Sequence, residues 1–286
     1  MTVNTDSTGR ITKPGDAAEP SKAMAKQPVK PQMVTMLEQM QPEIRRALPS
    51  HIKPERMQRV LLSALRSTPK LMECTPSSFF AAVLQAAQLG LEPNTPLGHA
   101  WILPYKGQAT LQLGYQGMID LTLRSGRCNS IIAKEVRDGD TFEYEDGLTP
   151  LLRHVASGAA DRHKRPLTHV YAIARMTQGD PIWIVLTRAE CSAARDMSPS
   201  KANAMAPWNT HFDAMCLKTA VRRLWKWLPK SSEMATAMVV DDAMETGRSI
   251  VNAVDDDVVD VLRSRGIDVT VVDADGVVVQ EGTLNE

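Results

Sequence analysis

The chain has 286 residues, of which 43% are hydrophobic, and this length allows one substantial core with appendages or two small domains. Its formal net charge is zero, yet residues 1–230 contain 30 Lys and Arg against 20 Asp and Glu, whereas residues 231–286 contain 3 against 13. A secreted or membrane-spanning protein is disfavoured, because the sequence shows neither a signal peptide nor a long apolar run.

The uneven charge indicates which partners to expect. The basic body suits a polyanion such as nucleic acid, and the acidic C-terminal region suits either a protein partner or shielding of that basic surface. The four cysteines lie far apart without a C-x-x-C pair, which is not the spacing of a disulfide framework or a zinc site. We therefore expect a cytoplasmic protein without a metal or other cofactor.

The N-terminal part of the chain is predicted to be an arm followed by helices. The first 32 residues are rich in Thr, Ser, Pro, Lys and Ala and lack apolar periodicity, so they predict a flexible basic arm. Apolar residues then recur at helical spacing over 33–48 and 54–68. An almost wholly apolar core helix is predicted to begin at Thr75-Pro76 and to end at Gly90.

Short strands are predicted through the middle of the chain. One hairpin is expected to turn at Lys106-Gly107 and another at the polar residues 177–180, and strands are expected on both sides of the Asp138-Gly139 turn. The predicted strands are residues 100–104, 109–113, 129–136, 141–144, 151–155, 167–176 and 181–186.

Two further helices are predicted within this region. The first covers 114–126, and its Gly114 and Gly117 permit close approach of another backbone. That backbone is either a nucleic-acid strand or the protein's own chain in a tight strand-to-helix turn. The second helix is predicted to begin at the capping box Thr187–Glu190, and a loop of small residues containing Lys201 follows it.

A basic helix is predicted from Trp208 to the helix-ending Pro229. Lys218, Arg222 and Lys226 recur every four residues beside a buried apolar stripe, so they would form one cationic face that can follow a phosphate chain. A solvated basic face is the plainer interpretation of the same pattern. The neighbouring residues that broaden the positive surface or supply indole rings are Arg223, Lys230, Trp225 and Trp227.

These elements predict an α+β fold with mixed helices around a small antiparallel sheet and hairpins. We expect three regions: a basic arm at 1–32, a core for DNA binding and oligomerisation at 33–230, and an acidic partner-binding region at 231–286. Within the last region the pattern predicts a helix near 255–265 and a hairpin of residues 269–272 and 277–280.

Motifs of known catalytic sites are missing from the sequence. It contains no G-x-x-x-x-G-K-[S/T] phosphate loop, no G-x-G-x-x-G after a strand and no H-E-x-x-H zinc motif, which disfavours an ATP-driven motor. A nuclease site holding Mg²⁺ would have to use the acidic cluster Asp138, Asp140, Glu143, Glu145 and Asp146. Because Glu143 and Glu145 share one face of a predicted strand, a solvent-facing edge is favoured over a metal site.

Six sequence blocks together resemble the RecT family of phage single-strand annealing recombinases. The similarity spans about residues 55 to 230, and six blocks in the same order are more specific than any one of them. The blocks are S-S-F-F-A-A-V-L-Q-A-A-Q-L-G-L-E-P (77–93), L-G-H-A-W-I-L-P-Y (97–105), Q-L-G-Y-Q-G-M-I-D-L-T-L-R-S-G (112–126), V-R-D-G-D-T-F-E-Y-E-D-G (136–147), T-H-V-Y-A-I-A-R (168–175) and K-T-A-V-R-R-L-W-K-W-L-P (218–229). The turn at 105–109 is shorter and poorer in lysine than that of many family members.

The resemblance implies a protein that coats single-stranded DNA, pairs it with a complementary strand without ATP and assembles into rings or filaments. It also implies a companion 5′-to-3′ exonuclease and contact with the host single-strand-binding protein. Subunit contacts are expected around Val60 and Leu61. Candidate DNA-binding residues are Lys106, Gln112, Tyr115, Gln116, Arg124, Arg127, Arg137, Lys201, Trp208, Lys218, Arg222, Arg223 and Lys226.

Two other functions share part of this pattern. A plain single-strand-binding protein would have the same basic groove but would protect strands instead of pairing them. A Mg²⁺-dependent nuclease would cut DNA and would depend on Asp138 and Asp140. We expect annealing without covalent chemistry, and hence no enzymatic activity.

Overall fold

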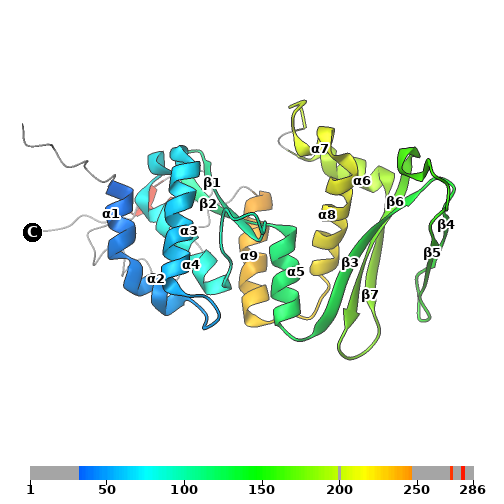
Figure 1. The fold of residues 1–286 in the computed structure, drawn as a ribbon, viewed down its shortest axis with the longest axis horizontal. Coiled ribbons are helices and arrows are strands. Elements are labelled where there is room, and N and C mark those ends of the chain that lie inside the picture. The colour runs from blue at the N-terminus through cyan, green and yellow to red at the C-terminus, as the bar shows by residue number, and fades with distance from the viewer. Residues whose placement is uncertain (1–31, 199–200, 247–270, 273–277, 281–286) are drawn as a thin grey trace, which may run out of the picture. The chain divides into compact units, whose positions relative to one another are not determined.

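The computed structural model describes residues 32–198, 201–246, 271–272 and 278–280, and these residues form the predicted α+β fold (Figure 1). Residues 1–31 of the predicted N-terminal arm and the predicted helix near 255–265 lie outside the described residues. The α-helices are α1 (Gln32–Gln39), α2 (Gln41–Ala47), α3 (Pro54–Ser67), α4 (Pro76–Leu89), α5 (Tyr115–Arg124), α6 (Arg188–Asp196), α7 (Pro207–Thr210), α8 (Phe212–Trp225) and α9 (Ser232–Thr246), with short 3-10 turns η1 (Pro69–Glu73) and η2 (Arg162–Lys164). The strands are β1 (Ala100–Tyr105), β2 (Gln108–Leu113), β3 (Cys128–Arg137), β4 (Thr141–Glu145), β5 (Leu151–Val155), β6 (Leu167–Met176), β7 (Ile182–Thr187), β8 (Val271–Val272) and β9 (Val278–Gln280).

Helix α4 lies at the centre of the packing in the N-terminal half. Thr75 is its N-cap and Pro76 its first residue, and Gly90 ends it with a left-handed φ of +61°, as predicted. Phe79 and Phe80 are fully buried, because α2, α9 and the β1–β2 hairpin all pack against α4. A helix that is apolar on nearly every side is stable only when it is surrounded in this way.

The β1–β2 hairpin forms as predicted. Its tip residues Lys106 and Gly107 have φ of +48° and +79°, which is the geometry of a two-residue turn between twisted strands. One face of the hairpin is buried against α4. Trp101, Leu103 and Tyr105 alternate onto the other face and are exposed.

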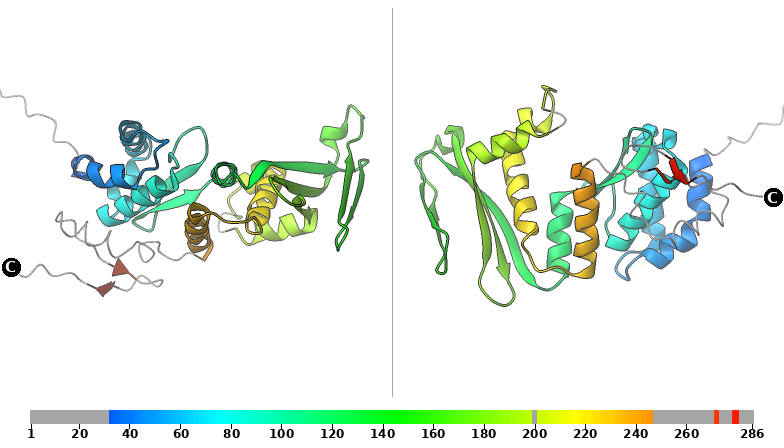
Figure 2. Two further views of the ribbon diagram at one scale, coloured as in Figure 1. Left: turned by 90° about the horizontal axis from the view of Figure 1, so that it is seen from below. Right: turned by 180° about the vertical axis from the view of Figure 1, so that it is seen from behind.

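A second sheet has the strand order β3-β6-β7, and all its neighbours are antiparallel. The β6–β7 hairpin forms as predicted, and Thr187 and Glu190 make the predicted capping box at the start of α6. Helix α8 packs against one face of this sheet, where Ala172 is fully buried. The β4–β5 hairpin lies on the other side of the sheet from α8 (Figure 2). No helix in the described part of the chain is long and apolar enough to cross a bilayer.

The strands on both sides of the Asp138-Gly139 turn form, but they do not pair with each other. β3 pairs with β6, whereas β4 pairs with β5 in a separate two-stranded sheet. The turn redirects the chain because the backbone N–H of Arg137 donates to the carboxylate of Asp140, and Gly139 has a φ of +82°. Close spacing in sequence therefore does not predict the strand partners here.

The predicted helix from Trp208 to Pro229 is wrong in its extent. It is divided into the four-residue α7 and the longer α8, because His211 leaves helical geometry with φ of −138° and ψ of +53°. α8 ends at Trp225, and Lys226 is its C-cap. The last apolar residue of the predicted stripe, Leu228, is nevertheless buried beyond the end of the helix.

Helix α9, which begins the predicted acidic region, packs against the rest of the fold. Met234, Ala237 and Val240 are buried, and the helix contacts β2, α4 and α5. The division of the chain at residues 32 and 230 stays a prediction, but the structure shows that at least the first helix after residue 230 shares the core. The short strands β8 and β9 pair antiparallel, in agreement with the predicted hairpin.

Candidate nucleic-acid interface

The predicted cationic stripe of α8 is largely occupied by contacts within the protein. One guanidinium nitrogen of Arg222 donates to both carboxylate oxygens of Asp241 on α9, at 2.7 and 2.8 Å. Lys218 is half-buried, and its pKa is lowered, chiefly by burial and also by the nearby positive charge of Arg222. Lys226 is exposed just beyond the end of the helix. The stripe is thus not an open row of cations, although DNA contact by these three residues stays a prediction.

The other candidates near α8 differ in how accessible they are. Arg223 is exposed, with its guanidinium 3.6 Å from the Glu190 carboxylate. Lys201 is exposed, and its ammonium donates to a backbone carbonyl at 2.7 Å. Trp208 is only 7% exposed and packs against Phe212, with 5.9 Å between ring centroids. The structure therefore places Trp208 in the core, where its ring faces other side chains.

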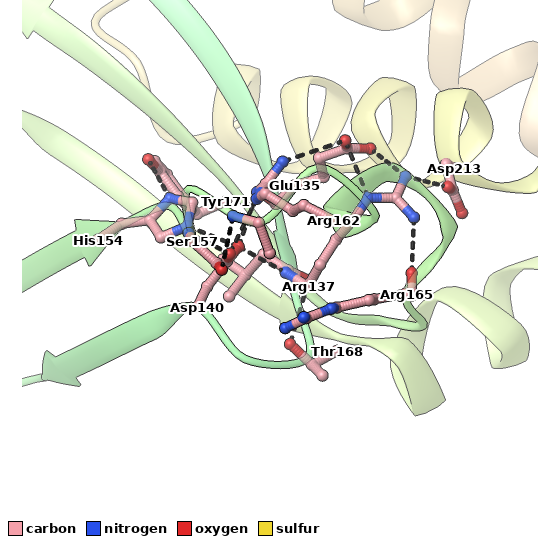
Figure 3. Close-up of polar contacts among 12 residues, drawn as sticks. Glu135, Arg137, Asp140, His154, Ser157, Arg162, Arg165, Thr168, Tyr171 and Asp213 are labelled. Carbon is pink, nitrogen blue, oxygen red and sulfur yellow. Dashed lines mark hydrogen bonds and ion pairs between the residues drawn. The ribbon is translucent and has the colours of Figure 1, made fainter.

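Arg137 was predicted as a groove cation, but its side chain is only 9% exposed and serves the fold. Its guanidinium donates to Glu135 through two nitrogens, at 3.0 and 2.8 Å, and also to Asp213 of α8. A further hydrogen bond of 2.8 Å goes to the backbone carbonyl of Arg165 (Figure 3). These contacts join β3 to α8 and to the loop before β6, so a phosphate would have to displace them.

Asp140 is the centre of the same network. Its carboxylate has no exposed surface and accepts two hydrogen bonds from Arg162, at 2.8 and 2.7 Å. It also accepts from the backbone N–H groups of Arg137 and Ser157, and it lies 3.1 Å from the His154 ring (Figure 3). The Arg162 hydrogen bonds hold the pKa of Asp140 far below its ordinary value, and the other contacts lower it further. Asp140 is therefore a charged, buried carboxylate that fixes the β4–β5 hairpin and the following loop.

The acidic residues of 138–146 do not converge on one point. Both oxygens of Asp140 are used by protein donors, and strand alternation places Glu143 and Glu145 on the face of β4 opposite Phe142. Among the described residues, no group of three His, Cys, Asp or Glu side chains is placed to hold a metal ion. Asp140, one of the two carboxylates on which the Mg²⁺ hypothesis depends, is thus engaged in holding the fold.

Gly114 and Gly117 face the protein's own backbone. A Cβ added to Gly114 would lie 1.9 Å from the carbonyl oxygen of Gly98, and one added to Gly117 would lie 2.1 Å from that of His99. Both distances are far below van der Waals contact. The start of α5 must therefore be glycine-rich so that it can pack against residues 98–99, and a nucleic-acid strand is not required to explain the pair.

Residues around α5 supply some of the accessible candidates. Gln116 and Arg127 are exposed, whereas Gln112 and Tyr115 are half-buried. Arg124 already has several partners: an ion pair of 3.0 Å with Asp120 and hydrogen bonds to the carbonyl of Leu89 and the ring of His51. Of these basic side chains, Arg127 is the one without a contact to another described side chain.

On the outer face of the β1–β2 hairpin, the structure adds exposed side chains that the sequence did not single out to the predicted candidates Lys106 and Gln112. Trp101, Leu103 and Tyr105 lie along it with exposed fractions of 39%, 37% and 58%. Across the strand pair they face Gln112, Thr110 and Gln108. The ammonium of Lys106 lies 5.5 Å from the centre of the Tyr105 ring. The signal in the sequence was the alternation in A-W-I-L-P-Y, which puts Trp101 and Tyr105 on the same side.

Comparison with known proteins gives three findings. The family model described as "RecT family" matches residues 55–256. The chain is 42% identical over 211 residues to Protein RecT of Escherichia coli (strain K12), covering 71% of this chain and 77% of that protein. It is 30% identical over 196 residues to the uncharacterized protein YqaK of Bacillus subtilis (strain 168), covering 68% of this chain and 66% of that protein.

Proposed function

Because this chain belongs to the RecT family, we propose that it binds single-stranded DNA and anneals complementary strands without ATP. Membership supports a role in DNA recombination by single-strand annealing. The observation that best supports the mechanism is the outer face of the β1–β2 hairpin, where exposed aromatic rings lie beside Lys106. Aromatic rings stack on bases of any sequence, and a lysine binds a phosphate, so this face suits a single strand without sequence preference.

The proposed mechanism needs no covalent step. Cations neutralise phosphates on the bound strand, which lowers the repulsion that a complementary strand meets as it approaches. Exposed cations among the candidates are Lys106, Arg124, Arg127, Lys201, Arg223 and Lys226. Base edges that are not held by hydrogen bonds to the protein can then test pairing with the second strand.

The protein is proposed to act as a homo-oligomer, in a ring or a filament. The expected contact around Val60 and Leu61 needs correction, because Leu61 is fully buried and Val60 is half-buried in α3. An interface through α3 would have to use its exposed residues, such as Arg59, Ser63 and Arg66. A companion 5′-to-3′ exonuclease and the host single-strand-binding protein are proposed partners on the strength of the family.

An energy-transfer assay tests the proposal against a plain single-strand-binding protein and a nuclease. Two complementary oligonucleotides carrying a donor and an acceptor dye are added in sequence to the protein, without ATP, at several salt concentrations. Annealing predicts pairing much faster than without protein, with both strands intact on a denaturing gel. Strands that bind but stay apart would indicate a protective binding protein, and strands cut only with Mg²⁺ would indicate a nuclease.

A further inference from the structure

The face of the β3-β6-β7 sheet that points away from α8 carries an apolar row. The strand register places Ile132, Ile173 and Trp183 next to one another on three neighbouring strands. Ile132 is 38% exposed, and the other two are half-buried. We call this row, together with Lys134 and Arg175, the outer sheet face.

Lys134 and Arg175 flank the row on the same side of the sheet. Lys134 lies two residues beyond Ile132 on β3 and pairs with Tyr171. Arg175 lies two residues beyond Ile173 on β6, on the opposite side of the row. Both side chains are exposed, and neither has a hydrogen bond or an ion pair with any other described residue. Strand geometry puts their backbone positions about 14 Å apart. That distance corresponds to about four stacked nucleotides of one strand.

The β4–β5 hairpin bounds the row on one side. Phe142 stacks on Tyr171, with ring centroids 5.8 Å apart and planes at 14°. Tyr144 lies edge-on to Trp183 at 6.5 Å and is 39% exposed. The hairpin is held in this position by the Asp140 network, since His154 of β5 contacts both Asp140 and Tyr171. Aromatic ring surface is thus fixed next to the row instead of moving freely.

The acidic side chains of the β4–β5 hairpin do not face Lys134 and Arg175. Strand alternation directs Phe142 and Tyr144 toward the sheet, and therefore directs Glu143 and Glu145 away from it. Glu143 also lies 3.7 Å from Arg153 of β5. On the strand positions that face the row, the charges are consequently those of Lys134 and Arg175.

We propose that the outer sheet face is a second nucleic-acid contact, distinct in its residues from the β1–β2 hairpin face. Lys134 and Arg175 bind phosphates of one strand, and the row between them contacts its bases or sugars. Two unpaired cations on either side of an apolar and aromatic row match the alternation of charged backbone and flat bases, whereas the core of a protein–protein interface is depleted of charged residues. The inference rests on the proposed function, because a protein that anneals strands must first bind single-stranded DNA.

The test compares the full-length protein with two double variants that remove the same charge. Lys134→Ala with Arg175→Ala removes the proposed phosphate contacts, and Lys53→Ala with Lys164→Ala removes two exposed cations elsewhere. Affinity for a labelled oligothymidylate is measured by anisotropy across a salt series. Loss of two phosphate contacts on a single strand should reduce the slope of log affinity against log salt by about 1.4. The control variant should keep the slope of the unaltered protein.

A second pair of variants tests the apolar row. Trp183→Ala should weaken oligothymidylate binding by about fivefold or more, and Trp183→Phe should restore most of it if ring stacking is the contact. Thermal melts of both variants are compared, since Trp183 also touches Tyr144. Weaker binding by Trp183→Ala with an unchanged melt supports the proposal.

Two results would overturn this inference without touching the proposed function. In the first, the unaltered protein anneals strands, yet the Lys134/Arg175 and Lys53/Lys164 double variants show the same slope of log affinity against log salt. In the second, the Lys134/Arg175 variant keeps the salt slope of the unaltered protein but sediments differently from it in the absence of DNA. That result would assign the face to contacts between copies of the chain. If the unaltered protein does not pair strands at all, the proposed function itself fails.

Discussion

Arg222 of α8 and Asp241 of α9 form an ion pair in which one guanidinium nitrogen reaches both carboxylate oxygens. Asp241 has a side-chain exposure of 4%, and that of Arg222 is 25%. The pair connects the helix that the sequence marks as most basic with the first helix of the predicted acidic region. At least one basic side chain of the body and one acidic side chain of the C-terminal region are therefore paired with each other within the fold.

Replacing Asp241 by Asn is expected to destabilise the protein by about 2 kcal/mol, because it removes the charged acceptor of two hydrogen bonds from the partly buried Arg222 guanidinium. Urea unfolding followed by circular dichroism measures this loss. Asp196→Asn is the matched control, since its pair with Arg195 is exposed and should contribute less than about 1 kcal/mol. Equal stability of the Asp241 and Asp196 variants would contradict a structural role for the buried pair.

Asp140→Asn is expected to cost about 3 kcal/mol at neutral pH, because Arg162 and two backbone N–H groups lose a charged acceptor. The folded-state pKa of Asp140 is lowered, chiefly by Arg162, so its charge stabilises the fold above the ordinary pKa of 3.8 and this contribution is lost as the pH falls below it. The difference in unfolding free energy between the unaltered protein and the variant should therefore be constant from pH 7 to about pH 5 and shrink toward pH 2. A difference that grows on acidification would contradict this assignment.

Local signals in the sequence predicted the ends of several elements, such as α4 and α6. Gly90 ends α4 because glycine adopts a positive φ without a steric cost. Thr187 begins α6 because its hydroxyl and the Glu190 carboxylate accept hydrogen bonds from free N–H groups at the start of the helix. Each of these signals lies within a few residues of the structure it determines. The β1–β2 and β6–β7 hairpins turn at Lys106-Gly107 and at residues 177–181, where Gly107 and Gly179 have positive φ.

Contacts between distant residues were not predictable from such patterns. β3 pairs with β6 because the apolar residues of both strands must face α8, and this depends on three elements at once. The sequence predicts Arg137 to be a surface cation, because it does not show that the sheet and α8 place Glu135 and Asp213 next to it. Among the candidate residues, Arg137 and Trp208 are buried, whereas Trp101 and Tyr105, which the sequence did not single out, are exposed.

Gly117→Ala tests the close approach of α5 to residues 98–99. Alanine in the interior of a helix normally stabilises it by about 1 kcal/mol relative to glycine. Here the added Cβ would lie 2.1 Å from the His99 carbonyl oxygen, so we expect a loss of at least 2 kcal/mol, about the size of an overpacked core. Gly158→Ala has nothing within 4 Å of its Cβ and should be neutral. Thermal melts of both variants decide the sign.

Tyr105→Ala tests the β1–β2 hairpin face as a surface for stacking on bases. The ring is 58% exposed and lies beside the Lys106 ammonium, so its loss should leave the fold intact and weaken oligothymidylate binding by about 1–3 kcal/mol if one base stacks on it. Tyr105→Phe keeps the ring and should bind nearly as well as the unaltered protein. Met197→Ala removes another large apolar side chain, 85% exposed and away from the hairpin, and should have no effect. Anisotropy titrations at one fixed salt concentration compare the three variants, and equal affinities for all of them would remove Tyr105 from the interface.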